Sequence, residues 1–288
     1  MYRQSTALRC DRLSPRRTAR ERGISAVRSA GRFGIPASME REQDARITAI
    51  QREVFEPGRS RFERYCDLVI GRRGWWAFLQ YELILLCTAL PGAVGLLLRS
   101  KLYPVLLGQT GRNVVFGSNV VLRHPHKIRI GDNVIVDDGC CLDAKGTDHQ
   151  GITIGSGVFI GRNTILSCKN GDIVVEEGAN IGFNCEIFSA SRVRVGRKVL
   201  IAAYSYLVGG DHMHDRVDVP VIDQGRTAAG IDVDDNAWIG AHVVVADGAR
   251  IGRDAVIGAG AVVIDEVPAF HIAAGVPARL VRDRRQPR

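Results

Sequence analysis

The aliphatic residues of this chain recur with a period of six. Between residues 233 and 263 one returns at every sixth position, at Val233, Ile239, Val245, Ile251, Ile257 and Val263. An amphipathic helix repeats every 3.6 residues and a half-buried strand every two, so neither produces this spacing. A six-residue repeat predicts flat, three-sided coils stacked as a parallel β-helix, with an aliphatic side chain turned inward on each side.

The same register continues upstream, and glycine often follows the inward residue. At a corner the chain needs a positive φ angle or a close approach between backbones, and glycine permits both. The upstream inward positions are Ile130, Val136, Leu142, Ile154, Ile160, Leu166, Val175, Ile181, Ile187, Val193, Val195, Ile201 and Leu207. The glycines are Gly131, Gly155, Gly161, Gly182, Gly196, Gly240, Gly252 and Gly258. The expected fold class is therefore all-β, with a β-helix over residues 112–268.

Two segments interrupt this register. Residues 143–151 break it first, and residues 209–230 break it again over a longer stretch. Loops that leave a rigid scaffold are frequent carriers of function. A solenoid also needs its open end covered, and residues 269–288 are expected to form a C-terminal cap and tail in which 272–282 fold as strand, turn and helix.

Residues 39–111 are expected to form an α-helical region before the β-helix. Helices are predicted over 40–55 and 61–80. Sixteen uncharged residues follow at 83–98, fewer than the ~20 that cross a bilayer, and a Pro–Gly pair interrupts them. They predict an apolar helical hairpin. Two placements are open: contact with a membrane surface, anchored by neighbouring aromatic residues, or packing on the β-helix end or across a subunit boundary.

The positive charge of the chain is concentrated at its N-terminus. The net charge is +8, and residues 1–38 carry nine arginines against Asp11 and Glu21, a balance of +7. This segment is rich in Arg and Ser, poor in acids and without periodicity, and is expected to be a disordered basic extension. An organellar transit peptide and a start codon assigned too early, with Met39 as the true start, are both compatible with it. The remainder is nearly neutral, so no nucleic-acid partner is predicted.

The cysteines favour a reducing compartment. There are seven, with no CxxC pair and no spacing typical of a disulfide framework. The N-terminus also lacks the uninterrupted apolar core of a secretory signal. We therefore expect a cytoplasmic protein, with a peripheral position at the inner face of the membrane left open by residues 83–98.

Four motifs follow one another in the C-terminal half: GDHMH in the long loop, then AWIGAHVVV, IGAGAVV and AAGVPARLV. With the repeats, they resemble the hexapeptide-repeat acyltransferases, the left-handed β-helix O- and N-acetyltransferases that depend on coenzyme A. The resemblance covers about residues 112–284 and is greatest to the galactoside, maltose and surface-polysaccharide O-acetyltransferases. It implies left-handed winding, an exception to the right-handed crossover rule. It also implies a homotrimer with active sites in the grooves between neighbouring β-helices.

By this resemblance His212, in GDHMH, is the catalytic histidine. A neutral hydroxyl is a poor nucleophile, and an imidazole with an ordinary pKa of ~6.5 can remove its proton as the new C–O bond forms. The thioester donor is already activated, so no covalent acyl-enzyme is required. His214 is the alternative base or a hydrogen-bond partner. The side chain of Asp211 is expected to point away from the ring of His212, and Asp211 is a candidate acceptor contact.

The resemblance also implies a donor channel for acetyl-CoA that runs towards the C-terminal cap. Trp238 and Ala241 would flank it near the thioester, although the alanine and the glycines of this region also suit plain corner packing. One departure concerns the turn after the last coil, where the family often has lysine and this chain has Asp265 and Glu266. The remaining donor contacts implied are Gly258 and Ala259 along the pantetheine arm, and Arg279 and Arg282 near the phosphates.

Acceptor contacts are less well specified. Asn184 matches a position at which family members contact the acceptor, and an asparagine that caps backbone amides of its coil is the structural alternative. Residues around the long loop, and Asp148 and His149 from the other ejected loop, could also approach the acceptor.

No metal is predicted. The γ-type carbonic anhydrases share the expected fold, but their zinc motif places two histidines five residues apart. The histidines of this chain, among them His124 and His126, offer no such pair.

Together these features predict an acyl-CoA-dependent O-acetyltransferase that acts on a sugar hydroxyl, in surface polysaccharide or lipid-linked saccharide biosynthesis. An N-acetyltransferase of an aminosugar or other amine would use the same base and the same donor channel. A non-catalytic β-helix scaffold is the alternative from another class of protein, and it would have no need of His212 or of the AGVPAR motif.

Overall fold

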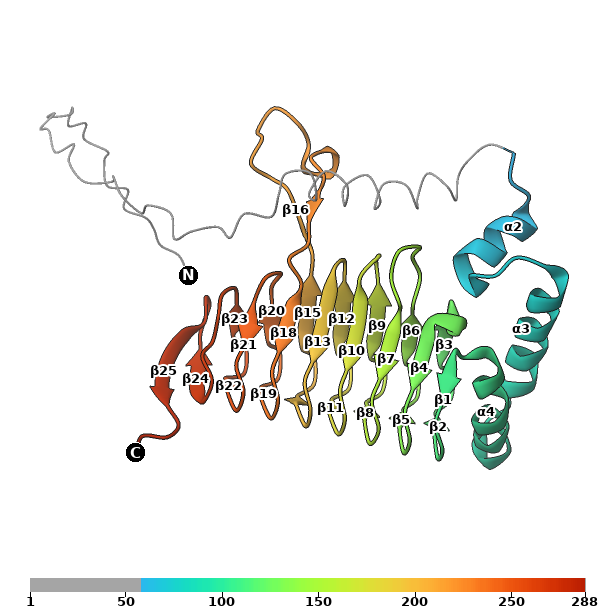
Figure 1. Cartoon of the computed structure of the whole chain (residues 1–288), viewed down its shortest axis with the longest axis horizontal. Helices are drawn as coiled ribbons and strands as arrows, with labels where there is room; N and C mark the ends of the chain where they lie inside the picture. The colour runs from blue at the N-terminus through green and yellow to red at the C-terminus, as the bar shows by residue number, and fades with distance from the viewer. Residues whose placement is uncertain (1–57, 288) are drawn as a thin grey trace, which may run out of the picture. The chain divides into compact units, whose positions relative to one another are not determined.

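A computed structural model describes residues 58–287 of the chain (Figure 1). The basic extension predicted over residues 1–38 and the helix predicted over 40–55 lie outside the described residues.

Helices precede the β-structure, as predicted, but the segment 61–80 is not one helix. Ser60 and Glu63 form a capping box at the start of the first helix. Gly71 ends the next with φ 73°, a left-handed conformation that glycine adopts without strain. The helices are α2 (Arg61–Tyr65), the π-helix η1 (Cys66–Ile70), α3 (Trp75–Thr88) and α4 (Gly92–Leu106). The three residues between α3 and α4 include Pro91, so the apolar segment does form a hairpin.

One face of the hairpin packs on the end of the β-structure. Tyr81 donates a hydrogen bond of 2.6 Å to the carbonyl of Leu122, and the ring of Tyr103 packs edge-on against Phe116 at 5.3 Å between centroids. Arg99 is 2% exposed. Its guanidinium donates to the carbonyls of Phe116 at 3.1 Å, Thr88 at 3.0 Å and Leu90 at 2.9 Å, and these bonds satisfy both the buried cation and the end of α3. Within the described residues, no helix is long and apolar enough to cross a membrane.

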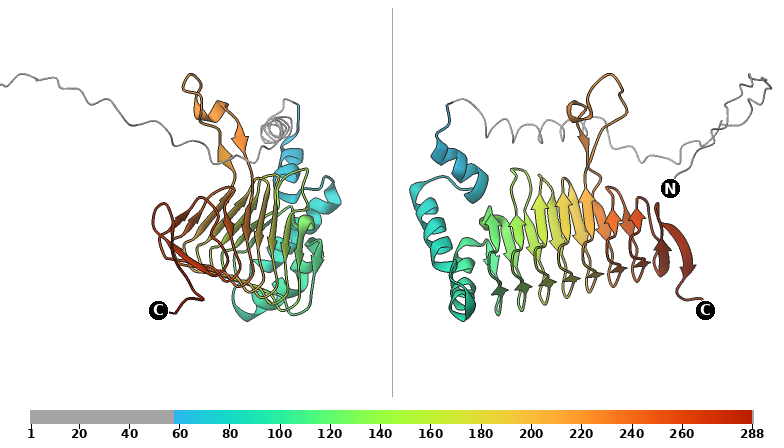
Figure 2. Two further views of the ribbon diagram at one scale, coloured as in Figure 1. Left: turned by 60° about the vertical axis from the view of Figure 1, so that its left-hand side comes forward. Right: turned by 180° about the vertical axis from the view of Figure 1, so that it is seen from behind.

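From residue 109 onward the chain winds through three parallel sheets, here called faces A, B and C (Figures 1 and 2). Face A contains β1 (Gln109–Thr110), β4 (Ile128–Ile130), β7 (Ile152–Ile154), β10 (Asp172–Val175), β13 (Arg192–Val195), β18 (Ile231–Val233) and β21 (Arg250–Ile251). Face B contains β2 (Val115–Phe116), β5 (Ile135–Val136), β8 (Phe159–Ile160), β11 (Asn180–Ile181), β14 (Leu200–Ile201), β19 (Trp238–Ile239), β22 (Val256–Ile257) and β24 (His271–Ala274). Face C contains β3 (Val121–Arg123), β6 (Cys141–Asp143), β9 (Ile165–Cys168), β12 (Glu186–Ser189), β15 (Tyr206–Gly209), β20 (Val244–Val245) and β23 (Val262–Val263).

One strand from each face makes a coil, from coil 1 (β1–β3) to coil 5 (β13–β15), coil 6 (β18–β20) and coil 7 (β21–β23). Each strand pairs with the strand above it in register, as in Ile181 with Ile201 and Ile201 with Ile239. The predicted β-helix is therefore confirmed. The left-handed sense of its winding stays a prediction.

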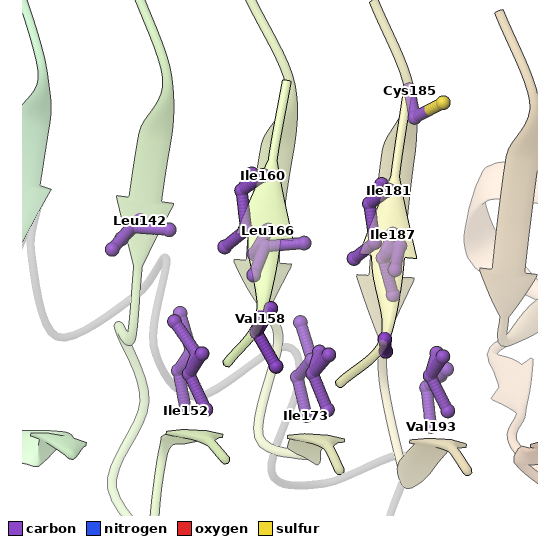
Figure 3. Packing of buried hydrophobic residues seen from close by; sticks show 14 of the residues in the cluster. Leu142, Ile152, Val158, Ile160, Leu166, Ile173, Ile181, Cys185, Ile187 and Val193 are labelled. Carbon is purple, nitrogen blue, oxygen red and sulfur yellow. The ribbon is translucent and has the colours of Figure 1, made fainter. Parts of the chain in front are cut away.

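The inward residues form columns down the inside of the stack (Figure 3). All six of the residues that set the period, from Val233 to Val263, are at most 1% exposed. Burying an aliphatic side chain of this size contributes about 1.5–3 kcal/mol. Because the same type of residue returns at the same place in every coil, parallel pairing and core packing select the same register.

Two reasons were given for glycine at the corners, a positive φ angle and a close approach between backbones, and the structure assigns them to different positions. None of the eight glycines that follow an inward residue has a positive φ angle. They are needed for close approach: a Cβ on Gly155 would lie 2.7 Å from the backbone nitrogen of Glu177 in the next coil. The positive φ falls two residues later, at Gly157 (70°) and at asparagines such as Asn133 (57°) and Asn163 (56°).

This difference predicts opposite tolerance at two glycines of one corner. Gly155→Ala should destabilise the protein by about 1–3 kcal/mol, because the new methyl group meets the backbone of the next coil. Gly157→Asn should change stability by less than about 0.5 kcal/mol, because the site is open and asparagine tolerates the left-handed conformation. Thermal unfolding of both variants beside the wild type measures this, and equal losses would contradict it.

The C-terminal cap differs from the prediction. Residues 272–282 were expected to end in a helix, but β24 turns back into β25 (Arg279–Asp283), which pairs with it antiparallel. The turn holds Gly275 with φ 98°. β24 pairs with β22 and is the last parallel strand of face B, and the returning strand satisfies the backbone groups of β24 that a helix would leave unpaired.

Three histidines near the N-terminal end of the stack, one buried and two half-buried, have lowered pKa values. Burial lowers the pKa of His124 and of His149, and burial followed by the charge of Arg72 lowers the pKa of His126 to about 4. A histidine with a lowered pKa binds fewer protons in the folded than in the unfolded state, so stability rises with pH between the two pKa values.

The protein should therefore become less stable as the pH falls from about 6.5 to about 4. His126→Gln should reduce the slope, whereas the exposed His214→Gln should not. Melting temperatures across this pH range check this expectation, with roughly 2–4 °C for each kcal/mol. An unchanged slope in His126→Gln would assign the effect to other groups.

Candidate active site

The long ejected loop leaves the stack at the corner between faces C and A, after β15 (Figures 1 and 2). Its base is a short antiparallel ladder of β16 (Asp211–His212) and β17 (Arg226–Thr227), which sets His212 opposite Arg226. The tip contains the 3-10 turn η3 (Val221–Asp223). Gln224 ties the two sides of the loop together, donating to the carbonyls of Arg216 at 2.6 Å and Val219 at 2.7 Å. The loop is thus a folded arm that extends away from the coils.

His212 is half-buried on this arm. Its Nδ1 atom is buried and has no hydrogen-bond partner among residues 58–287. The carboxylate of Asp211 accepts from the backbone N–H of His212 at 2.7 Å, so it is engaged with the backbone and not with the ring. Since Nδ1 is inaccessible to solvent, Nε2 is the nitrogen that can take a proton from an incoming hydroxyl. A partner for Nδ1 would have to come from outside this part of the chain.

His214 is exposed and lies beside the backbone carbonyl of His212. Its Nδ1 is 3.0 Å from the carbonyl oxygen of His212. That hydrogen bond is the main cause of the raised pKa of His214, and the negative charges of Asp215 and Asp211 raise this pKa further. A histidine with a raised pKa is more often protonated at neutral pH and is less available as a base. The geometry therefore favours His212 over His214, and both assignments stay predictions.

The expected donor contacts lie elsewhere on the stack. Trp238 is on β19 of face B and is 50% exposed. Ala241, Gly258 and Ala259 lie at the corner between faces B and C, in coils 6 and 7. A Cβ on Gly258 would be 3.0 Å from the side chain of Ala274, so packing against the cap is itself a reason for glycine there.

The two arginines expected near the phosphates are on β25. Arg279 is exposed and lines a cavity of ≈170 Å³ together with Asp265 and Glu266. Arg282 is half-buried, and its guanidinium donates to the carbonyl of Gln286 at 3.4 Å. The two carboxylates that replace a lysine of the family therefore share the cavity with Arg279. They make it less favourable for an anion than the arginine alone would suggest.

Asn184 adopts φ 53° at the corner between faces B and C. Asn119 and Asn163 occupy the equivalent corner of other coils with the same left-handed conformation. The corner by itself therefore accounts for an asparagine at this position, and the acceptor contact stays a prediction.

One chain does not bring the predicted residues together. His212 and Asp211 are at the corner between faces C and A, Trp238 is on face B, and Asn184 is at the third corner. The width of the prism separates them.

Sequence reasoning missed an aromatic ladder at the corner between faces B and C. Tyr204 and His242 occupy the left-handed position in coils 5 and 6 and stack with 4.9 Å between ring centroids. Phe183 packs edge-on against Tyr204 at 5.7 Å. A signal was present in the sequence, because most other coils carry asparagine or glycine where these two bulky residues stand. Among residues 58–287, no group of three or more His, Cys, Asp or Glu could hold a metal ion.

Fold and arm together define a hexapeptide-repeat β-helix with His212 on its long ejected loop. Residues 230–265 match the bacterial transferase hexapeptide model, and residues 110–144 match the hexapeptide repeat of succinyl-transferase. The predicted resemblance to hexapeptide-repeat transferases is confirmed by these matches.

Among the curated proteins that are similar to this chain are two acetyltransferases. One is Probable acetyltransferase Rv3034c of Mycobacterium tuberculosis, 31% identical over 163 residues, which are 57% of this chain and 54% of that protein. The other is the galactoside O-acetyltransferase of Escherichia coli, 34% identical over 130 residues, 45% of this chain and 55% of that protein. The chain thus spans about half the length of the curated relatives it matches.

A solved structure of AntD, an N-acyltransferase from Bacillus cereus in complex with dTDP and 3-hydroxybutyryl-CoA, is also similar. It is 21% identical with a TM-score of 0.45, over 65% of this chain and 88% of that one.

Proposed function

We propose that the protein is an acetyltransferase that moves the acetyl group of acetyl-CoA to a sugar hydroxyl, with His212 as general base. The observation that carries the proposal is the position of His212 on a folded arm that projects from the stack, with one ring nitrogen buried and the other able to meet a ligand. The similarity to two acetyltransferases supports the reaction class. A cytoplasmic location, where acetyl-CoA is available, and a role in surface-glycan synthesis belong to the same proposal.

The reaction needs only one proton carrier. Nε2 of His212 takes the hydroxyl proton as the oxygen attacks the thioester carbon, and a tetrahedral intermediate forms. The C–S bond then breaks, and the imidazolium returns its proton to the departing sulfur. The products are the acetylated sugar and free coenzyme A. Residues 209–230 contain neither serine nor cysteine, in keeping with direct transfer without an acyl-enzyme.

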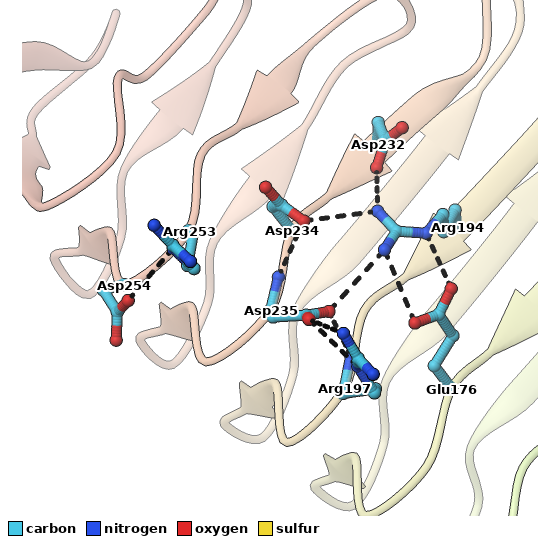
Figure 4. Close-up of polar contacts among 8 residues, drawn as sticks. All are labelled: Glu176, Arg194, Arg197, Asp232, Asp234, Asp235, Arg253 and Asp254. Carbon is cyan, nitrogen blue, oxygen red and sulfur yellow. Dashed lines mark hydrogen bonds and ion pairs between the residues drawn. The ribbon is translucent and has the colours of Figure 1, made fainter.

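We further propose that the active species is a homotrimer, because the outer surfaces of the three faces differ. Face A carries a network of ion pairs in which Arg194 contacts Glu176 at 2.8 Å and Asp232 at 2.7 Å (Figure 4). Such a surface suits solvent. Face B instead turns a nearly continuous apolar column outward, in the order Val115, Ile135, Phe159, Asn180, Leu200, Trp238 and Val256.

Face C is also mostly apolar on the outside, at Val121, Ile165, Tyr206, Val244 and Val262. Two different apolar faces that meet at one corner suit a heterologous contact, which closes into a ring when the rotation permits. Face C of one copy would then oppose face B of the next. The arm at the outer edge of face C would reach the neighbouring Trp238, and the base and the donor would meet between copies.

His212→Ala should lower kcat by about 10²- to 10⁴-fold, because it removes the group proposed to take the hydroxyl proton. His214→Ala, two residues away on the same arm, is the matched control and should stay within a few-fold of wild type. Steady-state kinetics with acetyl-CoA and a panel of sugars measures this. Wild-type kcat in His212→Ala would rule out the proposed base.

The shared site predicts complementation between two defective variants. His212→Ala and Trp238→Ala, co-expressed with different tags and purified as mixed trimers, should regain about one third of wild-type activity at low acetyl-CoA. In a ring of three that contains both variants, one of the three interfaces pairs an intact histidine with an intact neighbouring tryptophan. Mixed oligomers that stay as inactive as the parent variants would place both residues in one chain.

The acceptor atom distinguishes the proposal from its nearest alternative, N-acetylation of an aminosugar or other amine. With acetyl-CoA, hydroxyl sugars and their amino analogues should be compared by kcat/KM. We expect the hydroxyl series to be preferred. A preference for amines would keep His212 as base and change the substrate class.

A further inference from the structure

The helical hairpin exposes an unusually apolar surface, here called the outer face. Its members are large apolar side chains on α3, α4 and their connection, 42–80% exposed. They are Trp75, Trp76, Leu79, Leu83, Leu86, Leu90, Val94, Leu96, Leu97 and Val105. Soluble proteins rarely expose a contiguous apolar patch of this kind without using it to bind something.

The outer face is not needed by the fold. The opposite side of the hairpin already packs on coil 1 through Tyr81, Ile84, Arg99 and Tyr103, all of them buried. Both helices therefore carry large apolar side chains on the side away from the β-helix as well as on the side that packs against it. The β-helix accounts for one side only.

The exposed charged residues around the outer face are basic. Between residues 74 and 106 the charged residues are Glu82, Arg99 and Lys101. Arg99 is buried, and the half-buried Glu82 accepts a hydrogen bond from Tyr65, which leaves Lys101 as the one exposed charge. Arg72 and Arg73 are exposed immediately before α3. The outer face thus combines tryptophans with a basic border and no exposed acid.

A basic cavity adjoins the same edge. It has a volume of ≈340 Å³ and is bounded by residues of η1 and its flanks and by the corner segments of coils 1 and 2. Its charged lining is Arg59, Arg73, Lys127 and Lys145 against a single acid, Asp67. The excess of cations at this edge favours anionic groups nearby.

We propose that the outer face is a docking surface for an anionic lipid bilayer, with the hairpin lying in the interface and not crossing it. Helices of 14 and 15 residues span about 21–23 Å, less than the hydrocarbon thickness of a membrane. Apolar side chains enter the acyl region, Trp75 and Trp76 lie at headgroup depth, and Arg72 and Lys101 meet lipid phosphates, whereas Arg73 is paired with Asp67 at 2.8 Å. A second copy of the chain is a poorer occupant, because its outer face offers no acid to these cations.

The direct test uses full-length protein and flotation with vesicles, in the absence of donor and acceptor, so its outcome does not depend on the proposed reaction. Wild-type protein should float with vesicles of phosphatidylcholine mixed with phosphatidylglycerol, and much less with phosphatidylcholine alone. Leu83→Glu combined with Leu86→Glu should weaken binding at least about tenfold, because two leucines that would enter the acyl region become charges. Both side chains are exposed in the protein, so circular dichroism and melting temperature should stay unchanged.

Two comparisons isolate the outer face. Val217→Glu changes a fully exposed apolar residue on the ejected arm and should bind vesicles as wild type does. Arg72→Glu with Lys101→Glu should weaken binding only to the anionic vesicles, and added salt should have the same effect. Residues 1–57 are present in every variant, so their arginines contribute equally to each measurement.

Position in the bilayer can be read from fluorescence, because the chain has three tryptophans. In Trp238→Phe the remaining fluorophores are Trp75 and Trp76, and brominated lipids should quench them on vesicle binding. The proposal is overturned if wild-type protein does not float, if Leu83→Glu/Leu86→Glu binds as tightly as wild type, or if brominated lipids leave the fluorescence unchanged. A lower oligomeric mass of that double variant in light scattering, with no vesicle binding by wild type, would make the outer face a contact between copies.

Discussion

The stacking of inward aliphatic residues, each directly above its equivalent in the next coil, is the constraint on which the rest of this structure depends. Ile181, Ile201 and Ile239 lie in register on three successive strands of face B. A slip by one residue would turn the entire inner column towards solvent, so the core and the hydrogen-bond ladder hold the register together. The glycines after the inward residues serve the same end, because any Cβ there would push neighbouring coils apart.

In a rigid stack of this kind, functional loops are inserted at the corners between faces. Two of its corners are closed by short turns with a left-handed residue, and the corner between faces C and A is the one from which the long insertion leaves. The arm that carries His212 can vary without disturbing the core, because its two ends rejoin the same register at β15 and β18. The ion pairs of face A and the apolar columns of faces B and C then determine which surfaces meet solvent and which meet another molecule.

The two ends of the stack are closed by different devices. At the C-terminal end, β25 returns antiparallel along β24 and covers the last open edge. At the N-terminal end, the hairpin covers coil 1, and buried Arg99 ties both helices to the strand carbonyl of Phe116. The hairpin thereby fixes one apolar surface at the end of the stack, about four strand spacings, or ~19 Å, from the coil that carries the arm.

The sequence by itself determined the β-helix, its inward residues and the two ejected loops, because a period of six leaves no other regular structure. It also singled out His212, because the presence of a histidine in the main ejected loop can be read directly from the order of residues along the chain. It did not determine whether each corner glycine serves close approach or a positive φ, because both readings fit the same letters. The prediction for the C-terminal cap was wrong for a related reason. Residues 279–283 form a strand only because face B offers an open edge, which is a property of the assembled stack. Only the tertiary structure decided two further features: the separation of His212 from Trp238, and the exposure of one side of the hairpin while the other is buried. Both depend on which surfaces face each other in three dimensions.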